Sequence, residues 1–456
     1  MTNQDETAPK RRRKLKVSYI IIVLLLIIAA GYLLFRFNLK SNLQSKLDAI
    51  RAAGYPATCA ELDTWYTIPE FSENAADTII EAFSYYYEWD KKYLKDLPIA
   101  GTAQLPVRTE PISEEMKSLI AEYLADNEKA LELLHKSVAI KHCRYPTDFT
   151  QGPYTLIPHL SDIRKGVKML KLEAILHAEN AEPQMASDSV ITIFGVARSL
   201  VKEPILISQL VRIACQSLAV STLERILNRT KLTDEQLAEI GHTLLNIEDS
   251  NGMSRAFAGE RCSVGEFLRN PDPHTLLLFD GPSPSTHVIS LYKVAGLADA
   301  DALSYIDLMT KGMEAMQLEP HKRKEAAEAA EAELGEIPKI RVLLRMVMPA
   351  LSRYVTINLR CIAYLRTARA ALAVQRYRLA TGNLPHTLEE LTPTYLAIIP
   401  KDPFDGKDLR YKKLDTGFVV YSVDEDGNDD GGLEKPPRNR RKGESYTYDI
   451  TFIIQR

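Results

Sequence analysis

The sequence lacks the short motifs that identify the common enzyme classes. Its 456 residues contain no G-x-S-x-G elbow, no H-E-x-x-H zinc helix, no Walker motif and no other Gly-rich phosphate loop. This absence lowers the expectation of catalysis without excluding it, because catalytic side chains can converge from distant positions. We therefore expect a non-catalytic protein. The alternative is an envelope hydrolase with an unrecognised site in the helical region.

Cysteine pairs and an excess of basic charge are also missing. The five cysteines include no C-x-x-C pair, and no histidines stand at zinc spacing, so a metal-thiolate site is not expected. Most of these cysteines are expected to be small buried residues, and an odd count leaves at least one thiol free. With 57 Lys and Arg against 60 Asp and Glu, the chain has no positive excess to neutralise phosphates. Nucleic acid is therefore not an expected partner.

One long apolar run stands near the N-terminus. Residues 17–35, VSYIIIVLLLIIAAGYLLF, carry no charge and are long enough to cross the ~30 Å hydrocarbon core as a helix. Six bases precede the run: Lys10, Arg11, Arg12, Arg13, Lys14 and Lys16. The positive-inside tendency keeps such a cluster in the cytoplasm. We predict a cytoplasmic head (1–16) and a membrane anchor (17–37) of a single-pass cell-membrane protein whose remaining chain is extracytoplasmic.

A cleavable signal peptide is the alternative interpretation of this run. Ala29, Ala30 and Gly31 are small enough for a cleavage site. The apolar residues continue to Phe35, which makes the run longer than a typical signal-peptide core and favours an uncleaved anchor.

Residues 41–348 are predicted to form a helical extracytoplasmic domain. Apolar residues recur there at three- and four-residue spacing, with Pro and Gly clusters between the helices. The predicted helices span residues 43–53, 74–94, 113–140, 160–181, 186–202, 204–228 and 233–250. Ser113 and Thr233 are predicted N-caps. The proline-rich residues 270–286 are predicted to form a surface loop, with a pocket lid as the alternative, and 322–336 an exposed helix.

Two Glu and His pairs in this region share helix faces. Glu132 and His135 are three residues apart, and Glu173 and His177 are four apart. Such pairs could bind a metal or move a proton, but a di-iron bundle needs more inward glutamates than this region offers. Surface ion pairs are the simpler interpretation.

Residues 350–456 are predicted to form an α+β module. A stripe of apolar residues through Ile357 and Leu372 indicates a long helix, and Gly382 can end it in the left-handed conformation. Thr387 is predicted to cap a short helix after Pro385. Strands are predicted around 409–411, over 418–423 and over 446–454, with a hairpin turn at 415–417. A long helix packed on a small antiparallel sheet buries the apolar faces of both. The fold class is therefore mainly α with a C-terminal α+β module.

The segment DEDGNDDGG, residues 424–432, concentrates carboxylates on a Gly-rich loop. Its acids are Asp424, Glu425, Asp426, Asp429 and Asp430. Hard oxygen donors at this density suit calcium. The loop is not an EF-hand, because counting from Asp424 places Asp429 where that loop needs glycine.

The last hundred residues resemble the periplasmic domain of type II secretion major pseudopilins. The shared motifs, in order, are G-N-L-P, L-E-E-L, P-K-D-P-F, Y-S-V-D-E-D-G and a late D-I. The resemblance implies a calcium site with Asp426 and Asp449 as ligands and main-chain oxygen near Val423. Asp424, Asp429 and Asp430 are additional acids beside it. The residues before the apolar run, KLKVSYI, differ from the prepilin-peptidase site of that family.

These observations together predict a membrane-anchored bacterial envelope protein. We expect it to act as a structural or interaction component, with calcium stiffening its terminal loop and a link to secretion. Protein partners in the envelope are expected from this role. The sequence does not determine the partners or the oligomeric state.

Overall fold

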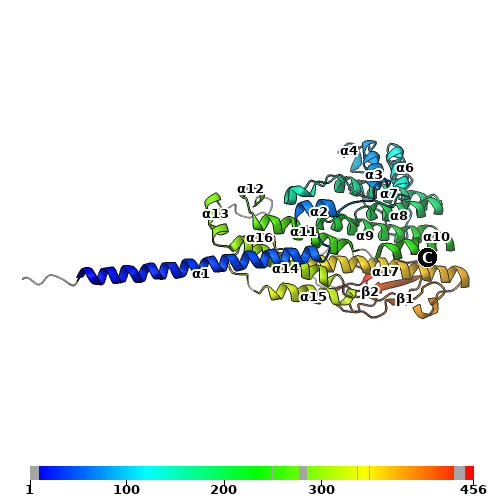
Figure 1. Cartoon of the computed structure of the whole chain (residues 1–456). Helices are drawn as coiled ribbons and strands as arrows, with labels where there is room; N and C mark the ends of the chain where they lie inside the picture. The colour runs from blue at the N-terminus through cyan, green and yellow to red at the C-terminus, as the bar shows by residue number, and fades with distance from the viewer. Residues whose placement is uncertain (1–9, 249–250, 277–284, 336, 349, 436–446) are drawn as a thin grey trace, which may run out of the picture.

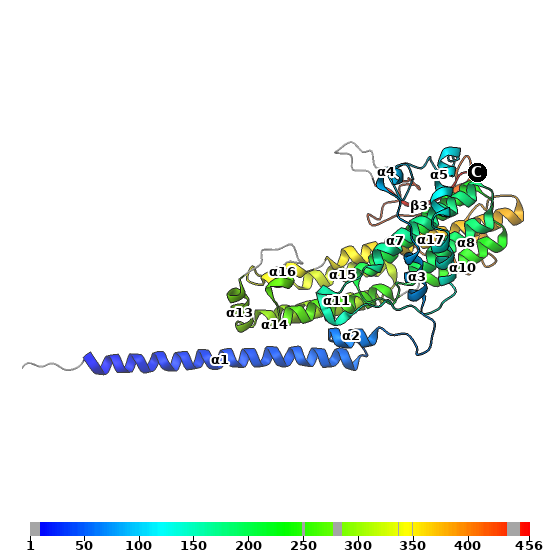
Figure 2. The same cartoon turned by 90° about the horizontal axis from the view of Figure 1, so that it is seen from above.

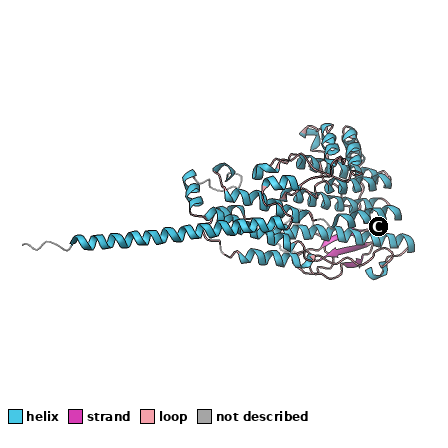
Figure 3. Ribbon diagram, in the orientation of Figure 1, coloured by secondary structure: helices cyan, strands magenta, loops and turns pink. Residues whose placement is uncertain are grey.

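The computed structural model describes residues 10–248, 251–276, 285–335, 337–348, 350–435 and 447–456. Most of these residues are helical, and a small three-stranded antiparallel sheet lies near the C-terminus (Figure 3). One long helix projects from the body (Figure 1). The predicted class, mainly α with a small C-terminal sheet, is confirmed at this level.

The projecting helix, α1 (Lys10–Ala52), joins two segments that the sequence analysis separated. It has 43 residues and runs without a break from the basic residues through the apolar run to the predicted helix 43–53. The part from Tyr19 is long and apolar enough to cross a membrane, and the side chains of its most apolar stretch are exposed. Helix α9 (Leu206–Arg229) passes the same test of length and composition, but it is 67% buried and is a core helix.

The helical body follows α1 in closely packed layers (Figures 1 and 2). Its first elements are α2 (Cys59–Trp65), α3 (Ala75–Ser84), α4 (Lys91–Leu94), α5 (Glu114–Ala125), α6 (Glu128–Ser137), the 3-10 helix η1 (Phe149–Tyr154), α7 (His159–Glu179) and α8 (Pro183–Arg198). After α9 come α10 (Asp234–Glu248), α11 (Gly252–Arg269), α12 (Pro273–Leu276), α13 (Thr286–Val294), α14 (Leu297–Ala315), α15 (Pro320–Glu333) and α16 (Val342–Val347).

Two predicted helices are each divided in two. The predicted helix 74–94 is α3 and α4, and the predicted helix 113–140 is α5 and α6. The second break lies at Asn127, whose buried side-chain amide hydrogen-bonds both the N–H and the C=O of Tyr87. A side chain used in this way offers the backbone an alternative to continuing the helix. The same contact holds Tyr87, which follows α3, against the junction between α5 and α6.

Helix starts that depend on local chemistry agree with prediction. Ser113 Oγ accepts from Met116 N at 3.2 Å. Thr233 and Gln236 form the reciprocal capping box, with N···O distances of 3.3 and 2.8 Å. The predicted helix 322–336 is found as α15. Of the predicted loop 270–286, residues 273–276 form α12, and residues 277–284 lie outside the described part of the chain.

The C-terminal module is built on α17 (Leu351–Thr381), which ends at Gly382 with φ +75° as predicted. The short helix after it is the 3-10 helix η3 (Leu388–Leu391), and Thr387 makes no capping hydrogen bond to it. Its start is held instead by Glu390, whose carboxylate accepts from His386 N at 2.8 Å. The prediction of a Thr387 cap is therefore wrong, because the Thr387 side chain makes no cap bond and Glu390 accepts from the N–H of the preceding residue, His386.

The sheet has the order β1 (Arg410–Lys413), β2 (Phe418–Ser422), β3 (Ile450–Ile454), with both pairs antiparallel. Val420 of β2 lies opposite Tyr411 of β1 and Phe452 of β3. The predicted last strand, 446–454, is shorter than expected, and residue 446 lies outside the described part. One face of the sheet packs against α17, as Figure 1 shows.

Helix α17 connects the sheet with the helical body. Its buried residues belong to one continuous apolar core with those of α9, α10 and the inner face of the sheet. Side chains of α9 also bind the free edge of β3. Glu224 accepts from Ile453 N at 2.6 Å, and Asn228 bonds both Ile453 O and Gln455 N, at 2.9 and 2.7 Å. The predicted units 41–348 and 350–456 thus share one core.

Candidate functional site

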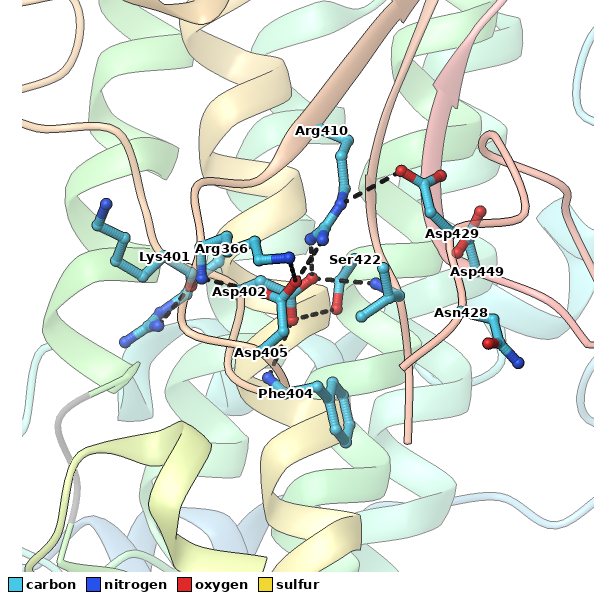
Figure 4. A network of polar contacts seen from close by, with 12 residues as sticks. Arg366, Lys401, Asp402, Phe404, Asp405, Arg410, Ser422, Asn428, Asp429 and Asp449 are labelled. Atoms are coloured by element: carbon cyan, nitrogen blue, oxygen red, sulfur yellow. Dashed lines mark hydrogen bonds and ion pairs between the residues drawn. The ribbon is translucent and has the colours of Figure 1, made fainter. Parts of the chain in front are cut away.

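A polar network centred on Asp402 joins the loop before β1 to the end of β2 (Figure 4). Asp402 is 1% exposed and accepts four hydrogen bonds. The donors are Phe404 N, Ser422 Oγ, Val423 N and Arg410 Nη1, at 2.9, 2.9, 3.0 and 2.6 Å. A buried carboxylate with this many donors is fully compensated, so it fixes the geometry of the loop.

Arg410 extends this network to the acidic loop. Its guanidinium also contacts Asp405, and its Nε lies 3.6 Å from Asp429 Oδ2. Burial raises the pKa of Asp405, but the hydrogen bonds from Arg410 and from Lys407 N, together with the charges of Arg410 and Lys407, lower the pKa below its ordinary value. Arg410 therefore lies within ion-pair distance of three carboxylates, those of Asp402, Asp405 and Asp429. Asp402 lies in the P-K-D-P-F motif, but no pattern in the sequence indicated a role for Asp402 or Arg410.

The first half of the acidic loop is tied to α17. Asp424, at φ +58°, forms an ion pair with Arg360 at 2.8 Å, and Glu425 binds the same guanidinium at 2.9 Å. Asp426 is exposed, and its carboxylate accepts from Asn428 N at 3.0 Å. These contacts neutralise or occupy the carboxylates with partners from the chain itself.

The second half gathers around Asp449. Its two oxygens accept from Gly432 N at 2.7 Å and from Asp430 N at 3.5 Å. Burial raises the pKa of Asp449, and the charges of Asp429 and Asp430 add to the rise, while the two backbone donors oppose it. Asp430 bonds Thr447 through Oδ1, whereas its Oδ2 is buried with no hydrogen-bond partner.

The six residues predicted to bind calcium are therefore divided between two places. Asp424 and Asp426 lie in the first half of the loop with Val423, whose N–H is bound to Asp402, and Asp429, Asp430 and Asp449 lie in the second. Within the described residues, no group of three or more His, Cys, Asp or Glu side chains is placed to hold a metal ion. Calcium binding by these residues stays a prediction of the resemblance.

The predicted Glu and His pairs make different contacts. Glu132 binds Lys129 at 2.8 Å, and His177 binds Glu182 at 2.6 Å. The remaining two, His135 of α6 and Glu173 of α7, bind each other across helices at 2.8 Å. Neither same-helix pair therefore forms a site of its own.

His135 links three helices. Its Nε2 contacts Glu173 of α7, and its Nδ1 lies 2.8 Å from Thr192 Oγ1 of α8, a hydroxyl that also lies 2.8 Å from Asp188 O. Burial lowers the pKa of His135, but the hydrogen bond and charge of Glu173 raise it above its ordinary value. The polar contacts of this one side chain therefore crosslink α6, α7 and α8.

A cleft of about 480 Å³ lies between α2, η1, α9 and α11. Its lining is mainly apolar, with Leu62, Phe149, Ile157, Ile205, Ile207 and Val264. Its charged group is Glu260, which accepts from Leu206 N at 3.3 Å. Burial raises the pKa of Glu260, with the Leu206 bond opposing. No Lys, Arg or His nitrogen among the described residues lies within 4.0 Å of this carboxylate. No signal in the sequence distinguished it.

Where α1 meets the body, polar and apolar contacts alternate. Arg36 forms an ion pair with Asp299 of α14 at 3.0 Å, and Lys46 forms one with Asp307. Farther along α1, Leu43, Leu47 and Ile50 pack with Ile306 of α14. The helix is thus docked on α14 over several turns, immediately after its apolar run.

These features define a mainly helical chain with an N-terminal helix long enough to cross a membrane and a C-terminal helix packed on a small sheet. Comparisons with protein-family models, with curated proteins and with solved structures found no match for this chain.

Proposed function

We propose that this protein is a single-pass membrane protein whose helical body stands on the extracytoplasmic side as a structural or interaction component. The observation that carries the proposal is the continuity of α1. At 1.5 Å per residue, its 43 residues extend about 65 Å, roughly twice the hydrocarbon core of a bilayer. The same rod can therefore cross a membrane and support the body through α14.

Fusing a periplasm-specific reporter to the C-terminus tests the topology. Alkaline phosphatase should be active there, because the bases before the apolar run retain the N-terminus in the cytoplasm. An N-terminal tag should remain on the membrane-extracted protein. A Leu24→Arg/Leu25→Arg variant carries two charges in the apolar run. It should show neither phosphatase activity at the C-terminus nor tagged protein in the membrane extract. An inactive C-terminal reporter in the parent, or a mature chain beginning near Gly31, would contradict the proposal.

Calcium binding and a secretion-related role remain predictions of the pseudopilin resemblance. The unpartnered Oδ2 of Asp430 beside Asp449 favours the second half of the loop over the first. We therefore expect any calcium-dependent rise in melting temperature to be lost in Asp449→Asn. Asp426→Asn, on the exposed first half, is the matched comparison and should retain most of the rise. A parent protein whose melting temperature does not respond to calcium would remove the calcium prediction.

Glu260 favours a second candidate function, the binding of a ligand in the 480 Å³ cleft. A carboxylate with a raised pKa in an apolar cleft marks a binding or active site. Because no cation of the described chain neutralises it, the fitting ligand is an apolar molecule with one amine. The envelope hydrolase, if the protein is an enzyme, would use this cleft.

Saturation-transfer NMR with phenethylamine and its neutral analogue 2-phenylethanol tests this candidate. The amine should bind the parent and the Glu239→Gln control, which changes an exposed acid outside the cleft. Its signal should weaken strongly in Glu260→Gln. Equal signals for the amine and the alcohol, or no effect of Glu260→Gln, would show that the carboxylate recognises no cation.

A further inference from the structure

Helix α13 presents an apolar face that no described part of the chain covers. Val288, Leu291 and Val294 recur every three residues along it and are 53%, 69% and 61% exposed. Ile289, on the opposite side, is buried in the core. Large exposed apolar side chains gathered on one helix face mark a surface that binds something apolar.

Contacts with α1 fix the position of this face along the axis of α1. The Tyr32 hydroxyl donates to Val294 O at the end of α13. Gly296, the next glycine, packs so closely that an added Cβ would lie 3.3 Å from Phe35 and 2.6 Å from Arg36. Arg36 is further held by Asp299. Figures 1 and 2 both place α13 at the end of the body nearest the projecting part of α1.

Tyr32 and Phe35 belong to the last turn and a half of the uncharged run 17–35. A surface held level with these residues lies at the boundary between headgroups and acyl chains when the run crosses a bilayer. The occupant that fits this position is lipid, because the same depth excludes a partner that needs an aqueous surface.

We propose that Val288, Leu291 and Val294 of α13 insert into the outer leaflet of the membrane that α1 crosses. The inference rests on the proposed anchoring of α1. The body then has two attachments to the bilayer, a spanning helix and an interfacial helix. Exposed apolar side chains along one side of a helix are suited to this interfacial position.

Depth-dependent fluorescence on the full chain in phosphatidylcholine–phosphatidylglycerol liposomes tests the proposal. Single cysteines labelled with an environment-sensitive dye are placed by Leu291→Cys, Phe35→Cys and Leu245→Cys. Leu245 is an equally apolar residue of α10, 52% exposed, and Cys143→Ser removes the one partly exposed native thiol. Doxyl-labelled lipids should quench the dye at positions 35 and 291 at least twofold more than at 245.

The three positions separate this inference from the anchoring on which it rests. Quenching at 35 with position 291 indistinguishable from 245 would overturn the α13 insertion and leave the anchor intact. No quenching at 35 would overturn the anchor, and with it the basis of this inference. Leu291→Trp, read by brominated-lipid quenching, decides the question if the cysteine variant does not fold.

Discussion

Replacing Asp402 with alanine should selectively destabilise the C-terminal module. The substitution leaves Phe404 N, Ser422 Oγ and Val423 N without their acceptor in a buried place, and it takes one of the carboxylates from Arg410. Removing one partner of a buried ion pair costs about 3–5 kcal/mol. Arg410 still holds Asp405, so we expect the lower end, about 3 kcal/mol of unfolding free energy.

Denaturant unfolding of the full chain in detergent measures this loss, and hydrogen exchange locates it. Amides of β2 should exchange faster in Asp402→Ala, because the end of that strand is held by Asp402. Asp408→Ala is the control. Asp408 pairs with Lys401 at 2.8 Å, but the two side chains are 47% and 58% exposed, so we expect a loss below about 1 kcal/mol. Equal unfolding midpoints for the two variants would refute the assigned role of Asp402.

Three further predictions concern other parts of the chain. Burial raises the pKa of Glu224 from 4.5 to about 7, so its contribution to stability is complete below pH 4.5 and is lost as the pH rises through 7. The melting temperature should therefore fall from pH 5 to pH 8, and less steeply in Glu224→Gln. Gly417→Ala should cost more than about 1 kcal/mol, because its φ is +96° and a Cβ would lie 1.8 Å from Ile454 O. Gly427→Ala, also at positive φ but in open space, should cost less in the same melts. Finally, the four buried thiols (Cys59, Cys215, Cys262 and Cys361) should react slowly with a disulfide reagent at pH 8, since burial raises the pKa of Cys215 and Cys361 to about 12. Rapid labelling before unfolding would contradict the buried placement.

Features that depend on neighbouring residues were predictable from the sequence. The caps at Ser113 and Thr233 and the helix stop at Gly382 each require only a few adjacent positions, and all three occur as expected. The length of the apolar run similarly specified a helix without reference to the fold. The C-terminal sheet followed from short apolar segments and a glycine turn between two of them.

Features that depend on tertiary contacts were not predictable. The helix break at Asn127 depends on Tyr87, forty residues earlier. Helical spacing correctly placed His135 and Glu173 on helix faces, but it could not show that they bind each other across two helices. The acidic loop was identified by composition, whereas its division between Arg360 and Asp449 depends on how α17 approaches the sheet.

The side chains of α9 that occupy the edge of β3 restrict how this protein can assemble. An uncovered edge strand offers N–H and C=O groups on which another strand can add. Both backbone groups of Ile453 and the N–H of Gln455 are already bonded to Glu224 and Asn228, so these groups are not free to pair with a strand from another chain. The opposite edge, β1, carries exposed Lys412 and Lys413, whose charges repel a second copy of the same edge. Both edges of the sheet therefore disfavour fibre growth by the addition of strands from further copies of this chain.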